Sequence, residues 1–215
     1  MKPFKYLDIE NYDIITEKLR YYILNSLYLN QTEKSDINFT FTKRFDGQPL
    51  YDIRSHKTFW NFLDFNDVLN AIPELNVACQ KLDISPFNFN LIVIPRDYGE
   101  LHSDAQPDKA SFPFRINWPV HNCDSFTKVR FFKLKTNKTI NTNYVPPNAT
   151  VKEETPTSIY DKTDIDHALG YYILTKPVLI NYLVPHAVEF PKGFLASYPR
   201  VIMSIDFHSE TLNLE

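Results

Sequence analysis

Hydrophobic residues in the first part of the chain recur at the spacing of helices. Between about residues 13 and 28 they fall three or four positions apart, which predicts an amphipathic helix with a wide apolar face. A second helical stretch is expected from Asp67, and Pro73 is suited to the first turn of a third. Residues 38–42 and 50–53 have the composition of short strands. We therefore expect a mostly helical annex in this part of the chain.

From Pro86 onward the pattern becomes that of short strands. Residues 87–94, Phe-Asn-Phe-Asn-Leu-Ile-Val-Ile, predict a strand, and in residues 114–118 hydrophobic and polar side chains alternate. This alternation puts Arg115 and Asn117 on one face of a strand and their apolar neighbours on the other. Further strands are expected at 127–134, 171–174, 177–183, 194–197 and 201–207. Short strands at this density, separated by turns, predict a sandwich or a jelly-roll barrel.

A long polar segment, residues 137–166, interrupts the series of strands. It contains Pro146 and Pro147 among many Thr, Glu and Asn residues, and its hydrophobic positions show no period. Connections of this length without secondary structure are uncommon in compact domains, and many of them cover active sites. We expect an irregular loop that is either a lid or a passive insertion. The whole chain is expected to be a single domain, with the annex at 1–85 and the β core at 86–210.

Composition narrows the class of protein. The chain has 215 residues, enough for one sizeable core, and 15% of them are aromatic. The net charge is −3 with Lys and Arg scattered, so nucleic-acid binding is not expected. The N-terminus has no signal-like apolar region and no window approaches a membrane span, so we expect a soluble, cytoplasmic protein. The four glycines are too dispersed for a Rossmann or phosphate-binding loop, and Cys79 and Cys123 are expected to be reduced thiols.

Three residues have the types and spacing of a metal site. In a strand, positions i and i+2 point to the same side, so His102 and Asp104 can bind one ion together. His186 follows a distant apolar run and can supply a third ligand from a neighbouring strand. Two imidazoles and one carboxylate can occupy one face of an octahedral Fe(II) and leave positions open for a chelating co-substrate and O2. A cation, Arg200, stands at the start of the next apolar strand.

This order of residues resembles that of the Fe(II)- and 2-oxoglutarate-dependent oxygenases, over about residues 86–208. Within this superfamily, Phe-Arg-Ile-Asn-Trp-Pro-Val followed by Pro-His-Ala-Val is most similar to the aspartyl/asparaginyl β-hydroxylase-like branch. The resemblance implies a mainly β fold, a double-stranded β-helix (jelly roll, cupin-like) with an N-terminal helical annex. It also implies that His102, Asp104 and His186 bind Fe(II). Some members of that branch lack the metal-binding Asp, whereas this chain has Asp104.

The resemblance further implies how the co-substrate is held. Arg200 would pair with the distal carboxylate of 2-oxoglutarate, because a guanidinium can donate two parallel hydrogen bonds to it. Arg115 and Asn117 would line the same site. Ser204 is a further candidate, although the superfamily often shows Arg-x-Ser and here Ser204 lies four residues past Arg200.

The function implied is that of a dioxygenase that uses Fe(II), 2-oxoglutarate and O2 to hydroxylate an unactivated carbon. The substrate would be a peptide side chain, an amino acid or a small metabolite. Two alternatives remain: a cupin-like Zn or Mn protein acting on an anionic substrate, and a non-enzymatic jelly-roll binding module. The sequence defines neither the substrate nor the oligomeric state.

For the individual residues, ordinary structural roles are the alternatives. Arg200 would then form an ion pair, His186 would be a core histidine, and Arg115 and Asn117 would lie on the exposed face of an edge strand. His121, near Cys123, is expected to lie in a turn after the strand at 114–118.

Overall fold

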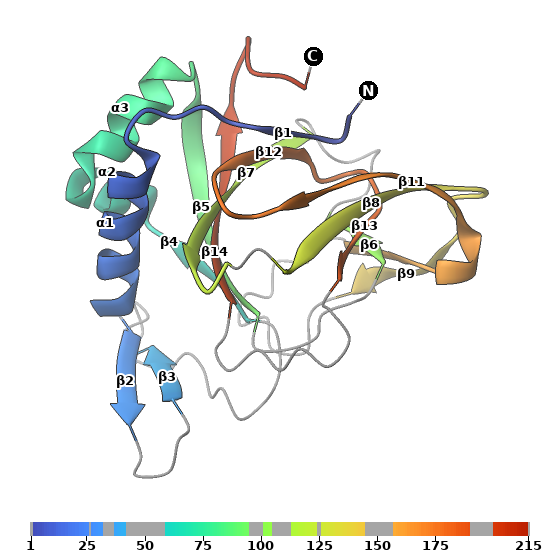
Figure 1. The fold of residues 1–215 in the computed structure, drawn as a ribbon, viewed down its shortest axis with the longest axis horizontal. Coiled ribbons are helices and arrows are strands. Elements are labelled where there is room, and N and C mark those ends of the chain that lie inside the picture. Colours follow the sequence, from blue (N-terminus) through green and yellow to red (C-terminus); the bar gives the residue numbers. More distant parts are fainter. Residues whose placement is uncertain are drawn as a thin grey trace.

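The computed structural model describes residues 2–25, 27–31, 37–41, 59–94, 101–104, 113–123, 126–144, 157–189 and 200–214. Two six-stranded sheets face each other, and helices cover one of them (Figure 1). In order, the first sheet holds β1 (Phe4–Tyr6), β12 (Val178–Asn181), β7 (Phe114–His121), β14 (Arg200–His208), β5 (Ser85–Ile94) and β4 (Phe59–Leu63). The second sheet holds β11 (Ile165–Ile173), β8 (Lys128–Leu134), β13 (His186–Glu189), β6 (His102–Ser103), β10 (Thr157–Tyr160) and β9 (Thr139–Tyr144).

The core strands alternate between the two sheets. β5, β7, β12 and β14 belong to the first sheet, β6, β8, β11 and β13 belong to the second, and the pairings are antiparallel. This winding is that of a double-stranded β-helix, so the predicted fold class is confirmed. It brings strands that are far apart in the sequence next to one another, as in the pairing of β14 with β5 and β7.

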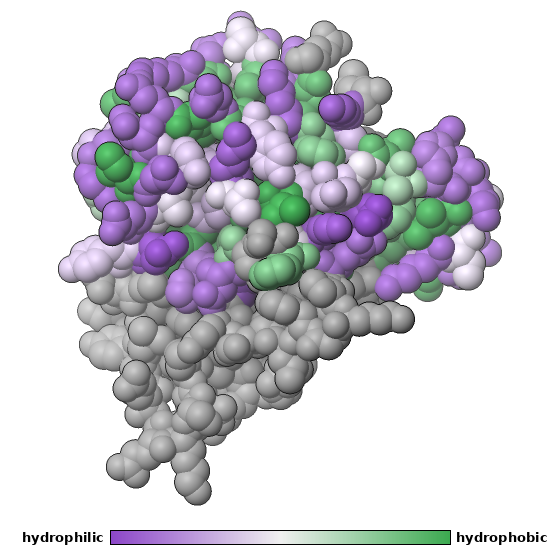
Figure 2. Space-filling view, in the orientation of Figure 1, coloured by the Kyte–Doolittle hydropathy of each residue, from purple (hydrophilic) through white to green (hydrophobic). Residues whose placement is uncertain are grey.

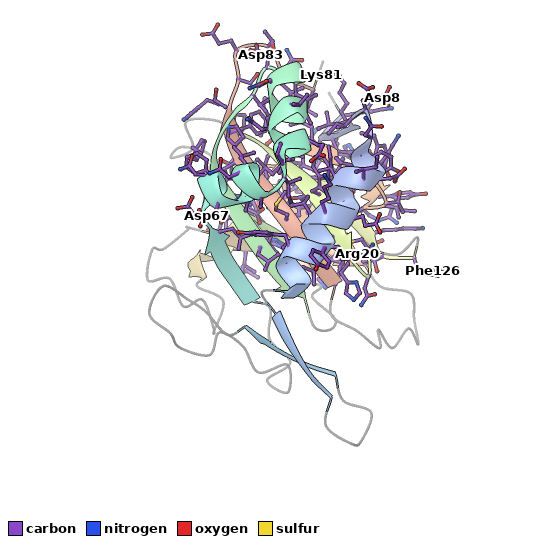
Figure 3. All side chains as sticks on the ribbon, turned by 90° about the vertical axis from the view of Figure 1, so that its left-hand side faces the viewer. Asp8, Arg20, Asp67, Lys81, Asp83 and Phe126 are labelled. Atoms are coloured by element: carbon purple, nitrogen blue, oxygen red, sulfur yellow. The ribbon has the colours of Figure 1, made fainter. Side chains whose placement is uncertain are left out.

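The helices form a layer on the outer face of the first sheet. They are α1 (Tyr12–Asn25), α2 (Phe65–Ala71) and α3 (Pro73–Lys81), followed along the chain by a 3-10 turn at Lys162–Asp164 between the strands of the second sheet. Figure 3 shows α1 and α3 in front of the strands, with Arg20 and Lys81 among the labelled side chains. Arg20 Nε donates a hydrogen bond to the backbone oxygen of Val120 at the end of β7 (3.0 Å).

The helical layer follows the sequence predictions closely. α3 begins at Pro73 as expected, and Asp64 caps α2 by accepting hydrogen bonds from the next turn. The end predicted for the first helix is wrong, because α1 ends at Asn25 and Leu27 already belongs to β2. β2 (Leu27–Gln31) pairs with β3 (Ile37–Phe41), so strand pairing competes successfully with continuation of the helix.

The two faces of the first sheet differ in chemistry. The outer face packs its apolar side chains against the helices in one core cluster, which includes Ile116, Trp118, Met203, Ile205, Leu19 and Leu75. Trp118 also donates from Nε1 to Thr16 Oγ1 of α1 (2.8 Å). The inner face carries apolar side chains such as Ile92 and Ile202 together with buried polar residues, namely Asn90, Arg115, Asn117, Arg200 and Ser204. Because strand side chains alternate between faces, the same strands contribute to the core under the helices and to the interior between the sheets.

The prediction for residues 137–166 is wrong at both ends of the segment. β9 and β10 form there and pair with each other, and β11 begins at Ile165. β10 pairs on its other side with β6, the strand of His102. The polar composition of the segment reflects a second sheet that is exposed on its outer side, as the burial pattern of β11 shows. Residues 145–156, like the strands expected at 50–53 and 194–197, lie outside the described residues.

The surface of the described residues is mixed. Figure 2 shows hydrophilic side chains spread over one face, with smaller hydrophobic areas between them. Among the described residues, no helix is both long enough and apolar enough to cross a membrane. Cys79 and Cys123 are both free thiols, in agreement with the sequence analysis.

Candidate functional site

The three predicted metal ligands lie together in the structure. His102 and His186 are direct cross-strand partners on β6 and β13, and their ring centroids are 4.5 Å apart. Asp104 follows β6, and its Oδ1 lies 3.3 Å from His102 Nε2 and 3.8 Å from His186 Nε2. The three ligand atoms lie within 4.8 Å of one another. These side chains therefore form a cluster that can hold a metal ion.

Local hydrogen bonds orient the ligands. Nδ1 of His186 lies 2.9 Å from the backbone oxygen of Val184, so a proton on Nδ1 leaves the lone pair of Nε2 facing Asp104. The backbone N–H of Asp104 donates to the oxygen of Tyr182 (3.0 Å). Both contacts tie the ligands to the segment between β12 and β13. The cluster is therefore preorganised by the backbone as well as by its own side chains.

The protonation states suit metal binding. Burial alone would raise the pKa of Asp104, but the hydrogen bond with His102 and nearby positive charges hold this pKa below its usual value. Burial, together with His102, lowers the pKa of His186 to about 4. Near neutral pH the cluster thus contains an ionised carboxylate and, at His186, a neutral imidazole. Metal ions bind these two forms.

Arg115 is a neighbour of the cluster and connects two carboxylates. Its Nη1 donates to Asp104 Oδ2 (3.0 Å) and its Nε donates to Asp206 Oδ1 (2.7 Å). The guanidinium lies over the ring of Tyr182, 4.7 Å from the centroid. Burial opposes its charge, but Asp206 and Asp104 outweigh this effect and raise the pKa of Arg115. β7 lies between β12 and β14, and Arg115 and Asn117 are buried, so the alternative of an exposed face of an edge strand is wrong.

A second polar cluster surrounds Arg200, at the start of β14. Ser204 donates to Asn117 Oδ1 (2.9 Å), and Asn117 Nδ2 donates to the phenol oxygen of Tyr172 (3.1 Å). Burial raises the pKa of Tyr172 to about 12, although the nearby charge of Arg200 acts in the opposite direction. Arg200 is 4% exposed, and its Nε and Nη1 are buried with no hydrogen-bond partner among the described residues. Two buried N–H groups of a cation without an acceptor are costly, so a bound anion would stabilise this site.

Apolar side chains lie beside the two polar clusters. Phe131 contacts the ring of His186 on one side (centroids 5.4 Å apart) and that of Tyr172 on the other (6.0 Å). Phe131 and Tyr172 belong to a core cluster with Ile92, Val178, Ile180 and Ile202. Phe131 therefore links the metal-ligand cluster to the surroundings of Arg200 through direct ring contacts. The chain thus places Arg200 and a cluster that can hold a metal ion beside the same apolar side chains.

The sequence analysis missed four polar residues of this interior, which are Tyr172, Asp206, Asn88 and Asn90. Asp206 had a usable signal, because Arg200, Ser204 and Asp206 occupy alternate positions of an otherwise apolar strand. Tyr172 had no such signal, since it stands beside Tyr171 and only the fold decides which ring is buried.

The other histidines described by the structure stay apart from the cluster. His121 ends β7, which runs three residues beyond the strand predicted, and Asn122 follows with a φ of 50°. Cys123 Sγ lies 3.3 Å from the backbone oxygen of Val201. His167 is exposed on β11, and His208 stacks on Phe87 (centroids 4.5 Å apart).

Comparisons with known proteins found similarity in structure and none in sequence. No family model matches the chain, and no curated protein matches it in sequence. One similar solved structure is AviO1 from Streptomyces viridochromogenes Tue57, with 12% identity, 99% of this chain and 92% of that chain covered, and a TM-score of 0.45. Another is a Pseudomonas putida prolyl-4-hydroxylase, with 12% identity, coverages of 98% and 94%, and a TM-score of 0.40. At such identities the likeness concerns the fold alone.

Proposed function

We propose that this protein is an Fe(II)- and 2-oxoglutarate-dependent dioxygenase that hydroxylates an unactivated carbon. The observation that carries the proposal is the buried guanidinium of Arg200, whose Nε and Nη1 have no acceptor among the described residues. Its charge acts on Tyr172, whose ring contacts Phe131, and Phe131 contacts His186 of the cluster with His102 and Asp104. A chelating dicarboxylate can bind a metal at one end and a guanidinium at the other.

The donor set of the cluster fits Fe(II). Two imidazoles and one carboxylate on one side of an ion leave its remaining positions for other ligands, which is the arrangement of non-haem iron oxygenases. Structural zinc sites instead have four protein ligands, and the cluster of described residues has three. The open positions therefore support a catalytic rather than a structural role for the ion.

The surroundings of Arg200 fit a carboxylate. Because Ser204 donates to Asn117 Oδ1, the amide nitrogen of Asn117 faces Tyr172 and donates to its oxygen. The Tyr172 hydroxyl accepts this bond, so its own proton is left to donate elsewhere, and the high pKa keeps that proton in place. Tyr172 and Arg200 together can offer a phenol and a guanidinium to one carboxylate. Hydrogen bonds from a charged donor to a carboxylate are about twice as strong as neutral ones.

The reaction expected combines 2-oxoglutarate, O2 and a substrate C–H bond. One oxygen atom enters the substrate as a hydroxyl group, the other enters succinate, and CO2 is released. Bound Fe(II) would supply the oxygen activation itself. The protein's part is to hold and orient: His102, Asp104 and His186 bind the ion, and Arg200 with Tyr172 binds the distal carboxylate. The apolar side chains of the interior would exclude water.

A peptide side chain, a free amino acid and a small metabolite all suit the chemistry. The resemblance of residues 114–120 and 185–188 to the aspartyl/asparaginyl β-hydroxylase-like branch favours a substrate that carries amino-acid groups. Arg115 and Asn117, taken from that resemblance as co-substrate residues, contribute in different ways here, because Arg115 contacts Asp104 and Asn117 contacts Tyr172.

An anaerobic titration tests the proposal. Fe(II) and 2-oxoglutarate added to the wild-type protein should produce a weak metal-to-ligand charge-transfer band in the visible range. His102→Ala should abolish the band, and Arg200→Met should shift its appearance to higher 2-oxoglutarate concentrations. Under air, succinate should form. A Zn or Mn protein acting on another anion would bind metal without the band, and a binding module would bind neither component.

A further inference from the structure

We infer that Arg115 and Asp206 are positioning residues that fix Asp104 as a metal ligand through one oxygen. The inference rests on the metal site of the proposed function. It extends this site to two residues that would not bind the ion themselves. Arg115 contacts the carboxylate of Asp104 on the side away from the histidines, and Asp206 holds Arg115. The pair forms a clamp, which we call the Arg115–Asp206 clamp.

The two oxygens of Asp104 have different partners. Oδ2 accepts a hydrogen bond from Arg115 Nη1 (3.0 Å). Oδ1 faces the two imidazoles, 3.3 Å from His102 Nε2 and 3.8 Å from His186 Nε2. With Oδ2 held by the guanidinium, only Oδ1 is directed at the space between the histidines. The carboxylate is therefore presented for binding through a single atom.

Asp206 accepts three hydrogen bonds from described residues through its two side-chain oxygens. Its Oδ1 accepts from Arg115 Nε (2.7 Å), and its Oδ2 accepts from Asn90 Nδ2 (2.8 Å) and from Asn88 Nδ2 (3.0 Å). The residues come from adjacent strands, since Asp206 is the cross-strand partner of Arg115 on one side and of Asn88 on the other. An asparagine at position 206 would turn an NH2 group toward one of these donors. Only an ionised carboxylate satisfies all three.

The guanidinium has little freedom within this arrangement. Its side chain is 9% exposed and lies over the ring of Tyr182, whose backbone oxygen accepts from the N–H of Asp104. Two carboxylates accept hydrogen bonds at the edge of the Arg115 guanidinium, while the ring of Tyr182 covers its face. The ordering of the long side chain is thus provided by the fold before any metal binds.

One-oxygen binding matters for the chemistry proposed. A carboxylate that binds through both oxygens occupies two coordination positions of an octahedral ion. Two histidines would then leave two positions instead of three, too few for a chelating co-substrate together with O2. By occupying Oδ2, Arg115 keeps the third position open. Residues that orient metal ligands in this way typically change metal affinity 10- to 100-fold when they are replaced.

A purely electrostatic role makes the opposite prediction. The charge of Arg115 repels a divalent cation, so its removal would strengthen metal binding if charge were its only effect. Removal of the Asp206 charge would weaken binding whether or not Arg115 is present. The positioning role predicts that Arg115→Met weakens metal binding, and that Asp206→Asn has an effect only while Arg115 is there to be held.

The experiment is a titration of the full chain with Co(II), without 2-oxoglutarate, by calorimetry and visible absorption. Arg115→Met should lower Co(II) affinity about 10- to 100-fold and change the absorption bands that report coordination number. Arg115→Lys should recover part of the affinity, because an ammonium can donate to Asp104. Asp206→Asn should lower the affinity in the wild-type background and leave it unchanged in Arg115→Met.

Arg130→Met is the matched control. It removes another arginine–carboxylate pair of the barrel, Arg130 Nε to Glu189 Oε1 (2.8 Å), which does not touch the ligands. Its Co(II) affinity and spectrum should equal those of wild type. If Arg115→Met fails to fold, Asn88→Ala provides the test, since it loosens Asp206, and through it Arg115, without removing a charge. Its Co(II) affinity should fall, and an unchanged affinity would overturn the positioning role.

The outcomes separate the two proposals. Wild-type protein that binds no Co(II) would contradict the metal site and so the proposed function. Wild-type binding with equal or tighter binding by Arg115→Met, or an equal loss from Asp206→Asn in both backgrounds, would overturn the positioning role and leave the metal site standing.

Discussion

His186 lies directly opposite His102 on paired antiparallel strands, with ring centroids 4.5 Å apart. The two residues come from distant parts of the chain, yet the backbone pairing of β13 with β6 sets their separation. Phe131 is the partner of His186 on the other side, so the imidazole sits between an aromatic ring and its fellow ligand. The metal-ligand cluster is therefore a consequence of strand register.

Replacement of either histidine should abolish metal binding. His186→Asn is the more informative variant, because its amide nitrogen can still donate to the oxygen of Val184 while Nε2 is lost. We expect no Fe(II) or Co(II) binding and a folded protein, measured by calorimetry and circular dichroism. His167→Asn, which changes an exposed residue of β11, is the control and should bind metal normally. Metal-dependent succinate formation by His186→Asn would contradict the ligand assignment.

Arg200→Met should weaken 2-oxoglutarate binding without lowering the stability of the ligand-free protein. Loss of the charged partner of a buried carboxylate costs about 2 to 5 kcal/mol, or roughly tens- to thousands-fold in 2-oxoglutarate affinity. The protein without ligands should be equally stable or more stable, because Nε and Nη1 have no partner to lose among the described residues. Calorimetry and urea unfolding measure the two effects. A destabilised variant with unchanged 2-oxoglutarate affinity would instead indicate a structural ion pair.

Tyr172→Phe should weaken 2-oxoglutarate binding without removing it. The phenol is one of two donors proposed for the carboxylate, and its loss also leaves Asn117 Nδ2 without its acceptor. We expect about a tenfold loss of affinity, equal to about 1.4 kcal/mol. Tyr171→Phe is the control, since its ring is 44% exposed on the same strand. Equal effects of the two changes would argue against a direct role of the phenol.

The stability of the metal-free protein should fall between pH 6.5 and pH 4. The His186 imidazole has an ordinary pKa of 6.5, and burial lowers it to about 4 in the folded protein. In this window the unfolded chain binds more protons than the folded one, so the free energy of unfolding falls with the pH, by roughly 3 kcal/mol in all. Urea unfolding at several pH values measures the slope. His186→Asn should show a smaller slope; an unchanged slope would rule out His186 as its source.

Gly170→Ala should destabilise the fold. Gly170 has a φ of 139°, and an added Cβ would lie 3.3 Å from a ring carbon of Phe4. Phe4 stacks on Phe131 (centroids 5.9 Å apart), so little room exists for its displacement. A strained backbone conformation of this kind costs on the order of 1 to 3 kcal/mol. Leu169→Ala, an exposed neighbour, is the control in urea unfolding, and an equal cost for both would refute the strain argument.

The metal-ligand cluster was predictable because it obeys a local rule. Two ligands at i and i+2 need only an extended backbone, and a third at the start of another strand needs only that the strands pair. The fold class was predictable for a similar reason, since the alternation of hydrophobic and polar residues that marks a strand is visible within a few residues. The position of Arg200 was also predictable, because this residue stands at the start of an apolar strand.

The partners of Arg115 were not predictable in the same way. Its two carboxylates come from different elements, and the cross-strand pairing of Asp206 with Arg115 depends on the register of β14 against β7. Sequence alone shows a polar side of β7 but does not say whether that side faces solvent or a second sheet. Arg115 is buried because this side of β7 meets Asp104, which follows β6 of the second sheet, and the ring of Tyr182.

The strand that carries His102 is only two residues long, too short to keep a shape of its own. It takes its geometry from β13 on one side and from β10 on the other, where Ile159 is the partner of His102. Tyr160 adds a hydrogen bond from its N–H to Leu101 and a hydroxyl contact with Ser103. β10, which lies between β8 and β11 along the chain, thus supports the strand of His102 and with it the candidate metal site. A shortened version of this protein should therefore retain β10.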